Sequence, residues 1–490
     1  MQQQLKRFAL FATTLLSTTV APMLHGLTPA LHAAQVKAKT ANAFVDSMCV
    51  VTHLGYPDTP YGSNYKGVKQ KLVELGIRHI RDGGSSDDFI AKIKELGAVG
   101  IKTTFVLDPQ TGVAPNPSYW VKTPSYYIND FVKNKVGTNA IDAVEVLNEI
   151  DLFYDQNGGY YWRPGDSEKL NNNPTSPLYW KRYVKSVTKD TWKALKSDPL
   201  TAGVKVIGPS LGGSYDYSTK SPLGNLSAYV DWGNFHPYPG GGNGYSYPFK
   251  YNTIAKYHWH GNFPSVNMDE WPYAFDIYKP PFGSKPMAAT ETGYNTSTAS
   301  KGISEKMHGK YMPRLFLEYF RLGIVRTCSY ELVDEWNQPG NPEANYGLLR
   351  HDLSPKPAYT ALKNLIGLLK DSGDSFTPGS LEYTLTVNPP TGYNRTQYVH
   401  HLLLQKQDGK FYLVLWHEIS NGDTSSTPVR ELKPPAMPTK VKLNTPISSA
   451  TIYSLDDSGK MSSSAATISK NTISLKVGDK VRIIEIVPSK

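Results

Sequence analysis

Between about residue 45 and residue 370, short apolar runs rich in β-forming residues alternate with stretches of helical periodicity. Eight apolar runs stand out: Asp46–His53, Arg78–Asp82, Lys102–Leu107, Ala143–Asn148, Lys205–Pro209, Val230–His236, Pro286–Glu291 and Val325–Leu332. The clearest helical stretches are Val68–Leu75, Asp88–Leu96, Leu178–Leu195 and Glu305–Leu322. Because alternating strands and helices build parallel βαβ units, this rhythm predicts an α/β fold, a (β/α)8 TIM barrel over residues 45–375.

A doubly wound open sheet is the competing architecture for the same alternation. Such a sheet normally carries a glycine-rich phosphate-binding turn after its first strand. The segment that follows the first apolar run here is His53-Leu-Gly-Tyr-Pro-Asp, which lacks that pattern. We therefore expect the closed barrel.

The pattern changes near residue 376, where long helical stretches end and short strand-like runs begin. These runs are Glu382–Val387, Gln397–Gln405, Lys410–His417, Thr439–Leu443, Ala450–Ser454, Thr472–Val477 and Lys480–Val487. Turn residues such as Asp408 and Gly409 separate several of them, which indicates a β-sandwich domain over residues 376–490. Residues 35–44, from Gln35 to Phe44, are predicted to be a short polar linker.

The N-terminal residues have the features of an export signal. Lys6 and Arg7 form a basic start, and the mostly apolar run Phe8–Ala21 is too short to span a bilayer. Small residues follow, and cleavage at Ala33 or Ala34 would make residues 1–34 a signal peptide. The alternative is an N-terminal membrane anchor. We expect a secreted protein, extracellular or periplasmic, with no integral membrane segment once the signal is removed.

Charge and composition narrow the class of partner. The formal net charge is +10, but lysines and arginines are scattered, so nucleic-acid binding has little support. An acidic polysaccharide or an anionic cell surface stays open as a partner. The chain has 32 Tyr and 9 Trp, a content that fits either ordinary packing or stacking against sugar rings.

Candidate catalytic residues follow from the expected barrel, in which functional side chains lie at the C-terminal ends of the strands. The fourth apolar run delivers Asn148 and Glu149 to that end, and the seventh delivers Glu291. Strands four and seven lie on roughly opposite sides of a barrel, so the two carboxyl groups face each other. One protonated and one ionised carboxyl group are what glycosidic cleavage requires. For either glutamate alone, a solvated loop carboxylate is the simpler interpretation.

With these residues the chain resembles the clan A retaining β-glycosidases, a group that includes families 5, 30, 39, 51 and 79. The resemblance implies that Glu149 is the acid/base, that Glu291 is the nucleophile, and that Asn148 contacts the sugar 2-hydroxyl. It covers the whole barrel, and several of these families also carry a sandwich. It does not single out one family.

Other strand ends agree with the resemblance. It implies that Tyr238 hydrogen-bonds the nucleophile, that His236 lies near the substrate, and that Arg81 pairs with the nucleophile and keeps it ionised. Arg78 is an alternative to Arg81, and a structural ion pair of Arg81 with Asp82 or a structural role for His236 remains open. An aromatic platform is expected after strand eight, from Trp336 or Tyr330. The segment that starts near Pro357 is read as the last barrel helix, with Tyr359 packing.

The expected reaction is hydrolysis of β-glycosidic bonds by double displacement, with retention and without cofactor or metal. The spacing of His258 and His260 alone is a weak metal signal. Aromatic loops predict an oligo- or polysaccharide substrate for a monomeric enzyme; they contain Tyr119, Trp120, Tyr160, Tyr161, Trp162, Tyr245, Tyr247, Tyr257, Trp259 and Trp271. The alternatives are a transglycosylase on the same site and a non-catalytic glycan-binding protein of the cell surface.

The only two cysteines, Cys49 and Cys328, fall on the first and eighth predicted strands. Those strands are neighbours once a barrel closes, so a disulfide is one interpretation. We expect instead two separate reduced cysteines in the core.

Overall fold

The structure is a computed structural model of the chain. It describes residues 34–107, 123–154, 160–162, 168–212, 223–238, 278–299, 302–371, 375–391, 399–419, 421–423 and 429–489. The predicted signal peptide lies outside these ranges, apart from Ala34. Within the part described, no helix is both long enough and apolar enough to cross a bilayer.

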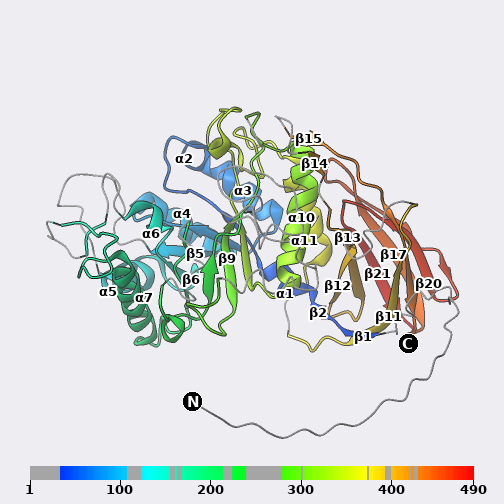
Figure 1. Cartoon of the computed structure of the whole chain (residues 1–490), viewed down its shortest axis with the longest axis horizontal. Coiled ribbons are helices and arrows are strands. Elements are labelled where there is room, and N and C mark those ends of the chain that lie inside the picture. Colours follow the sequence, from blue (N-terminus) through cyan, green and yellow to red (C-terminus); the bar gives the residue numbers. More distant parts are fainter. Residues whose placement is uncertain are drawn as a thin grey trace, which may run out of the picture. The chain divides into compact units, whose positions relative to one another are not determined.

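Eight parallel strands form the barrel that the sequence predicts (Figure 1). They are β3 (Met48–Val51), β4 (His79–Asp82), β5 (Lys102–Leu107), β6 (Ile141–Val146), β7 (Lys205–Ile207), β8 (Gly233–Phe235), β9 (Met287–Thr292) and β10 (Arg326–Ser329). The order β7-β6-β5-β4-β3-β10-β9-β8 follows the chain around a ring. A parallel bridge between Ile207 and Trp232 joins the two ends of this order.

Four of the eight predicted strands are two to four residues longer than the observed ones, because their ends belong to turns or, at Asp46, to a helix. The helices around the barrel are α1 (Ala41–Asp46), α2 (Pro60–Ser63), α3 (Tyr65–Leu75), α4 (Asp87–Ala98), α5 (Pro124–Tyr126), the π-helix η2 (Tyr127–Val136), α6 (Ile150–Phe153), α7 (Trp180–Lys196), the short 3-10 helices η3 (Ser227–Tyr229) and η5 (Pro342–Asn345), α10 (Glu305–Arg321) and α11 (Pro357–Leu369). Their ends follow local chemistry. Ser86 and Ser304 cap α4 and α10, Gly76 ends α3 in the left-handed conformation, and Pro357 begins α11.

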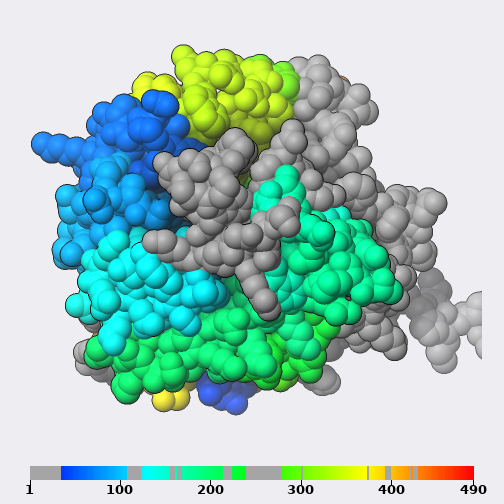
Figure 2. All heavy atoms as spheres, turned by 90° about the vertical axis from the view of Figure 1, so that its left-hand side faces the viewer, coloured from blue at the N-terminus to red at the C-terminus, as the bar shows by residue number. Residues whose placement is uncertain are grey.

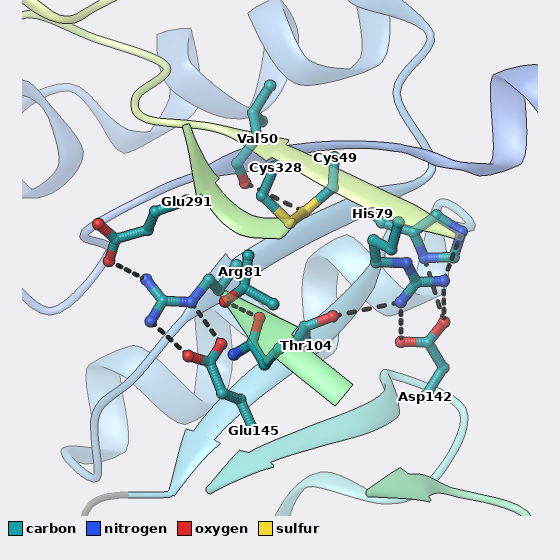
Figure 3. Close-up of a disulfide and its surroundings, with 12 residues drawn as sticks. Cys49, Val50, His79, Arg81, Thr104, Asp142, Glu145, Glu291 and Cys328 are labelled. Carbon is teal, nitrogen blue, oxygen red and sulfur yellow. Dashed lines mark hydrogen bonds and ion pairs between the residues drawn. A yellow bond between two sulfur atoms is a disulfide. The ribbon is translucent and has the colours of Figure 1, made fainter. Parts of the chain in front are cut away.

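The expectation of two separate reduced cysteines is wrong. Cys49 and Cys328 are joined in a disulfide inside the barrel (Figure 3). The two residues are direct partners in the register of β3 and β10, and both side chains are fully buried. Strand adjacency therefore brings the sulfur atoms together.

The C-terminal region is built from two antiparallel sheets, drawn yellow to red in Figure 1. Their strands are β11 (Ser380–Val387), β12 (Val399–Gln405), β13 (Phe411–His417), β16 (Met437–Leu443), β17 (Ile447–Leu455), β18 (Met461–Ala465), β19 (Ile468–Ser469), β20 (Thr472–Val477) and β21 (Arg482–Pro488); β14 (Gly422–Asp423) and β15 (Arg430–Glu431) form a separate pair. Alternate residues of both sheets form one apolar cluster, as expected for a sandwich.

The predicted linker is instead part of this folded region. Strand β1 (Ala34–Lys37) pairs with β11, and β2 (Lys39–Thr40) pairs with β12, so each C-terminal sheet ends in a strand from the start of the described chain. Helix α1 follows directly. Polar side chains in this segment face solvent, whereas Ala38, Ala41 and Phe44 are buried, an alternation that a short segment hides easily.

Helix α10 connects the barrel to the sandwich. Lys310 bonds Glu431 and Asp479, each at 2.9 Å. Arg314, fully buried, donates to the backbone carbonyl oxygens of His417 and Ile419 at 2.9 and 3.1 Å. A charged side chain that satisfies several carbonyl groups in the interior holds the two regions in one arrangement.

Candidate active site

Glu149 lies just beyond the C-terminal end of β6. The strand ends at Val146, and the backbone then takes positive φ angles at Leu147 (63°) and Glu149 (43°) before helix α6 begins. Left-handed conformations of non-glycine residues cost about 1–3 kcal/mol each and concentrate at functional sites. The strained turn brings the partly exposed Glu149 carboxyl group to the mouth of the barrel.

Glu291 lies near the end of β9 and is held by two donors. Arg81 Nη1 donates to its Oε1 at 2.6 Å, and the Tyr238 hydroxyl donates to its Oε2 at 2.8 Å. Of the two arginines considered from the sequence, Arg81 therefore reaches this carboxylate, while Arg78 bonds Asn42 on the outside.

A second carboxylate, Glu145, fixes the orientation of Arg81. Arg81 Nε and Nη2 donate to Glu145 at 2.6 and 2.9 Å, and Nη2 also donates to Asn148 Oδ1 at 2.8 Å. Figure 3 shows the guanidinium group between Glu145 and Glu291. Because Nε and Nη2 of the guanidinium group bond Glu145, Nη1 is left to bond Glu291.

Glu145 is absent from the residues selected from the sequence. Its neighbours Val144 and Val146 belong to the main apolar core, so alternation along β6 turns Glu145 toward the barrel interior, where it is fully buried. A charged residue in the middle of an apolar strand was the available signal.

His236 links Glu149 to β9 through a chain of hydrogen bonds. Phe235 N donates to Asn234 Oδ1, Thr290 Oγ1 donates to the same oxygen, and His236 Nε2 lies 3.0 Å from Thr290 Oγ1. Because the Thr290 proton is directed to Asn234, Nε2 must carry a proton and donate it. One further proton is then shared between His236 Nδ1 and Glu149 Oε1, which are 2.7 Å apart.

The charges of these groups oppose the effect of burial. Burial alone raises the pKa of Glu291, but the positive charges of His236 and Arg81 and the Tyr238 hydrogen bond bring it below the ordinary value. Burial likewise lowers the pKa of His236, yet Glu291 and the other two carboxylates raise it to about 10. Glu291 is thus ionised and His236 is charged near neutral pH.

The two candidate glutamates lie close together. Ligand atoms of Glu149, His236 and Glu291 are all within 4.8 Å of one another, so one oxygen of each carboxyl group approaches the other within that distance. The same three atoms have a spacing that a metal ion accepts. Arg81 and charged His236 offset two of the three formal negative charges of Glu145, Glu149 and Glu291.

Tyr330, one of the two aromatic residues expected after strand eight, lies beside these residues, and a platform role for Trp336 stays a prediction. The Tyr330 ring centroid is 6.3 Å from that of Tyr238 and 5.4 Å from that of Tyr346. The Trp336 side chain lies six residues farther on and is 38% exposed. Asp82, the alternative partner of Arg81, instead accepts from Thr52 Oγ1 and from the backbone at Leu54.

Several sequence predictions concern residues outside the part described. These are the aromatic loop residues Tyr119, Trp120, Tyr245, Tyr247, Tyr257, Trp259 and Trp271 and the histidines His258 and His260. Of the predicted aromatic loop residues, Tyr160 and Trp162 pack against Tyr183 of α7.

Solved structures of glycoside hydrolases share this architecture. A family 39 glycoside hydrolase from Bacteroides cellulosilyticus WH2 superposes with a TM-score of 0.56, over 92% of this chain and 83% of its own, at 16% identity. CelM2, a bifunctional glucanase-xylanase from a metagenome library, superposes with a TM-score of 0.53 over 93% of this chain and 98% of its own, at 12% identity. The catalytic domain of the family 30 xylanase C from Talaromyces cellulolyticus superposes with a TM-score of 0.51 over 92% of this chain and 98% of its own, at 13% identity.

The chain has the fold of these hydrolases. No family profile and no curated protein matches its sequence. At such low identities the likeness concerns the fold, and the chemistry must be argued from the residues themselves.

Gly212 supplies a test of the position of Glu149. A Cβ atom at Gly212 would lie 2.3 Å from Leu152 Cδ1 and 3.0 Å from Glu149 Cδ. We expect Gly212→Ala to displace the Glu149 carboxyl group and to lower kcat/KM about 10- to 100-fold, because small misplacements of reacting groups are costly. Gly203→Ala, whose Cβ would meet nothing within 4 Å, is the matched control. Unchanged kinetics of Gly212→Ala would show that the close contact is irrelevant.

The acid stability of the fold should depend on Glu145. Burial raises the pKa of Glu145, but the charge of Arg81 and the His236 contact outweigh this and lower it to about 2. A depressed carboxylate pKa contributes stability above the unfolded value, about 4.5, which is lost as the pH falls toward 2. Denaturant unfolding between pH 5 and 2.5 should therefore show a loss of about 2 kcal/mol from this group. Glu145→Gln should flatten the profile, whereas the exposed Glu382→Gln should not.

Proposed function

We propose that the protein is a retaining glycoside hydrolase in which Glu291 is the nucleophile and Glu149 is the acid/base. The observation that carries the proposal is the pair of carboxyl groups at the ends of β6 and β9, with one oxygen of each within 4.8 Å of the other. Retaining enzymes place these groups about 5–5.5 Å apart, whereas inverting enzymes leave about 6.5–9.5 Å for a water molecule. The close approach supports retention.

In the first step the Glu291 carboxylate attacks the anomeric carbon, and the bond to the leaving oxygen breaks. Glu149 gives its proton to that oxygen. In the second step Glu149, now ionised, takes a proton from water, and the water oxygen attacks the same carbon and releases Glu291. Both steps together add one water molecule across the glycosidic bond.

The surroundings suit these two roles differently. Arg81 and Tyr238 favour the ionised form of Glu291, which a nucleophile requires. Glu149 has its main side-chain contact with His236, across which a single proton is shared. We infer that this shared proton moves onto Glu149 and is delivered to the leaving group, which leaves His236 neutral until the second step returns a proton from water. Asn148, placed between Glu149 and Arg81, is oriented toward the bound sugar ring in this scheme.

Action outside the cytoplasm is part of the proposal. The N-terminal residues have the pattern of an export signal, and the buried disulfide between Cys49 and Cys328 fits an oxidising compartment. The substrate would then be an extracellular or periplasmic carbohydrate with β-glycosidic linkages.

The test is the stereochemistry of the first product. Proton NMR during hydrolysis of aryl β-glycosides and of β-linked oligosaccharides should show the β-anomer first, followed by mutarotation. Early appearance of the α-anomer would refute Glu291 as the nucleophile. If sugar is transferred to added acceptors in preference to water, the protein is a transglycosylase on the same site. Saccharide binding without turnover would favour a glycan-binding protein.

A further inference from the structure

Two buried side chains, Thr290 and Asn234, follow one another on the Nε2 side of the His236 ring, whereas Glu149 lies on the Nδ1 side. Asn234 belongs to β8 and Thr290 to the neighbouring strand β9. Figure 2 shows the face of the molecule where the segments after β3, in blue, and after β10, in yellow-green, meet. Asn234 and Thr290 are 1% and 0% exposed, so they lie beneath the surface and affect a reaction only through the residues that they contact.

The backbone determines the direction of the hydrogen bonds in this chain. Phe235 N and Thr290 Oγ1 each lie 2.9 Å from Asn234 Oδ1. Because the backbone N–H of Phe235 can only donate, the Asn234 amide must present its oxygen; the reverse orientation would turn its NH2 group toward another donor. That oxygen also accepts the Thr290 hydroxyl proton. The lone pairs of Thr290 Oγ1 are left facing His236 Nε2, 3.0 Å away.

Three carboxylates face the His236 ring. Glu149 Oε1 and Glu291 Oε2 lie 2.7 and 3.6 Å from Nδ1, and Glu145 Oε1 lies 3.7 Å from Nε2. Arg81 bonds both Glu145 and Glu291, so its charge is shared between those two groups. At 3.7 Å Glu145 is beyond hydrogen-bond distance. The partner of Nε2 is therefore the threonine hydroxyl, and the partner of Nδ1 is Glu149.

This arrangement gives the two ring nitrogens different roles in the proposed mechanism. The Nε2 proton is bonded to Thr290, whereas the proton between Nδ1 and Glu149 is consumed in the first step and restored in the second. After its delivery the neutral ring keeps the Nε2 proton, so Nδ1 is an acceptor and cannot donate to the Glu149 carboxylate. A carboxylate without that hydrogen bond is a stronger base toward the incoming water.

We propose that Thr290 and Asn234 are positioning residues for the acid/base steps, because they keep the proton of neutral His236 on Nε2 and leave Nδ1 to exchange a proton with Glu149. The inference rests on the proposed glycosidase function and deepens it. Without the threonine hydroxyl, the neutral ring can carry its proton on Nδ1 and donate to ionised Glu149. That state holds one proton fewer than the resting pair and cannot protonate a leaving group.

Thr290→Val tests the proposal because it removes the hydroxyl and keeps the shape of the buried side chain. The state with one proton fewer is then stabilised, so the shared proton should be lost at lower pH. We expect the basic limb of kcat/KM to move down by about one pH unit. We expect kcat/KM at neutral pH to fall about 10-fold. Asn234→Leu should move the limb in the same direction, because Thr290 can then donate to Nε2, and Thr290→Ser should keep the wild-type limb.

Thr292→Val is the matched control. Thr292 lies on the same strand and is fully buried, but its hydroxyl donates to Pro237 O at 2.9 Å and not to the imidazole. We expect this variant to lose thermal stability to an extent comparable with Thr290→Val and to keep the wild-type basic limb. If Thr290→Val lowers activity without moving the limb, the threonine supports the fold alone and the inference fails.

Nitrogen-15 NMR of the histidine side chains makes the same test without turnover, with the His236 signals assigned by their loss in His236→Gln. Neutral rings protonated on Nε2 and on Nδ1 have different nitrogen shifts. In an alkaline titration the wild type should pass from the charged ring to the Nε2–H form, and Thr290→Val should reach the Nδ1–H form at lower pH. A wild-type ring that becomes Nδ1–H would overturn the inference. No substrate is present, so this failure is distinguished from failure of the glycosidase proposal, which the product stereochemistry tests.

Discussion

Glu291→Gln should lower kcat/KM by on the order of 10⁴-fold or more, because an amide cannot attack the anomeric carbon. The substitution keeps the shape of the side chain: the amide oxygen can still accept from Arg81, and the amide NH2 group can donate to the Tyr238 hydroxyl oxygen. The fold should survive, which circular dichroism and a thermal melt would check. The loss should appear in kcat for both good and poor leaving groups, since the first covalent step itself is removed.

Glu149→Gln provides the contrast that assigns the two roles. Loss of the proton donor should lower kcat/KM about 10²- to 10⁴-fold. The cost should be small for aryl leaving groups that depart without protonation and large for sugars that need it. If Glu291→Gln instead shows this dependence on the leaving group and Glu149→Gln does not, the two assignments must be exchanged.

Arg81→Met should be the most damaging single change to the stability of the site. It leaves Glu145 and Glu291 buried without their shared cation. Breaking a buried ion pair by removing one partner costs about 3–5 kcal/mol, so the free energy of unfolding in denaturant should fall by that order. The pKa of Glu291, which Arg81 helps to lower, should rise, and the acidic limb of kcat/KM should move to higher pH.

Arg81→Lys separates charge from geometry. A lysine keeps one positive charge but cannot bond Glu145 in bidentate fashion while also reaching Glu291 and Asn148. We expect the acidic limb of kcat/KM for Arg81→Lys to lie between those of the wild type and Arg81→Met. We expect its kcat/KM at neutral pH to be close to that of Arg81→Met. If Arg81→Met keeps the wild-type pH profile, the arginine supports the fold alone and has no part in keeping Glu291 ionised.

The barrel could be predicted because each of its signals is local. An apolar run of four to six residues followed by a capped helix can be recognised as a strand and a helix from its own sequence. The chain order then determines which strands are neighbours. Glu149 and Glu291 could be selected for the same reason, since each ends such a run. Their short separation could not, because it depends on the strained turn at Leu147 and Glu149.

Features that depend on distant segments were harder to infer. Glu145 becomes meaningful only when Arg81, from another strand, meets it inside the barrel. The residues of β1 and β2 look like a linker because their partners, β11 and β12, lie more than 300 residues away along the chain. The disulfide was open for a related reason, since strand order indicates neighbours but not register.

The strands β1 and β2 have a consequence for how this chain is made. Each C-terminal sheet takes an edge strand from the first described residues, so neither sheet is complete until synthesis has passed through the entire barrel. A ribosome releases the early strands long before their partners exist. An excised catalytic fragment that begins at residue 45 would leave β11 and β12 with open edges, which invite strand-to-strand aggregation between molecules. A protein expressed for study should therefore include residue 34 and everything after it. Any cleavage during export should likewise fall before residue 34.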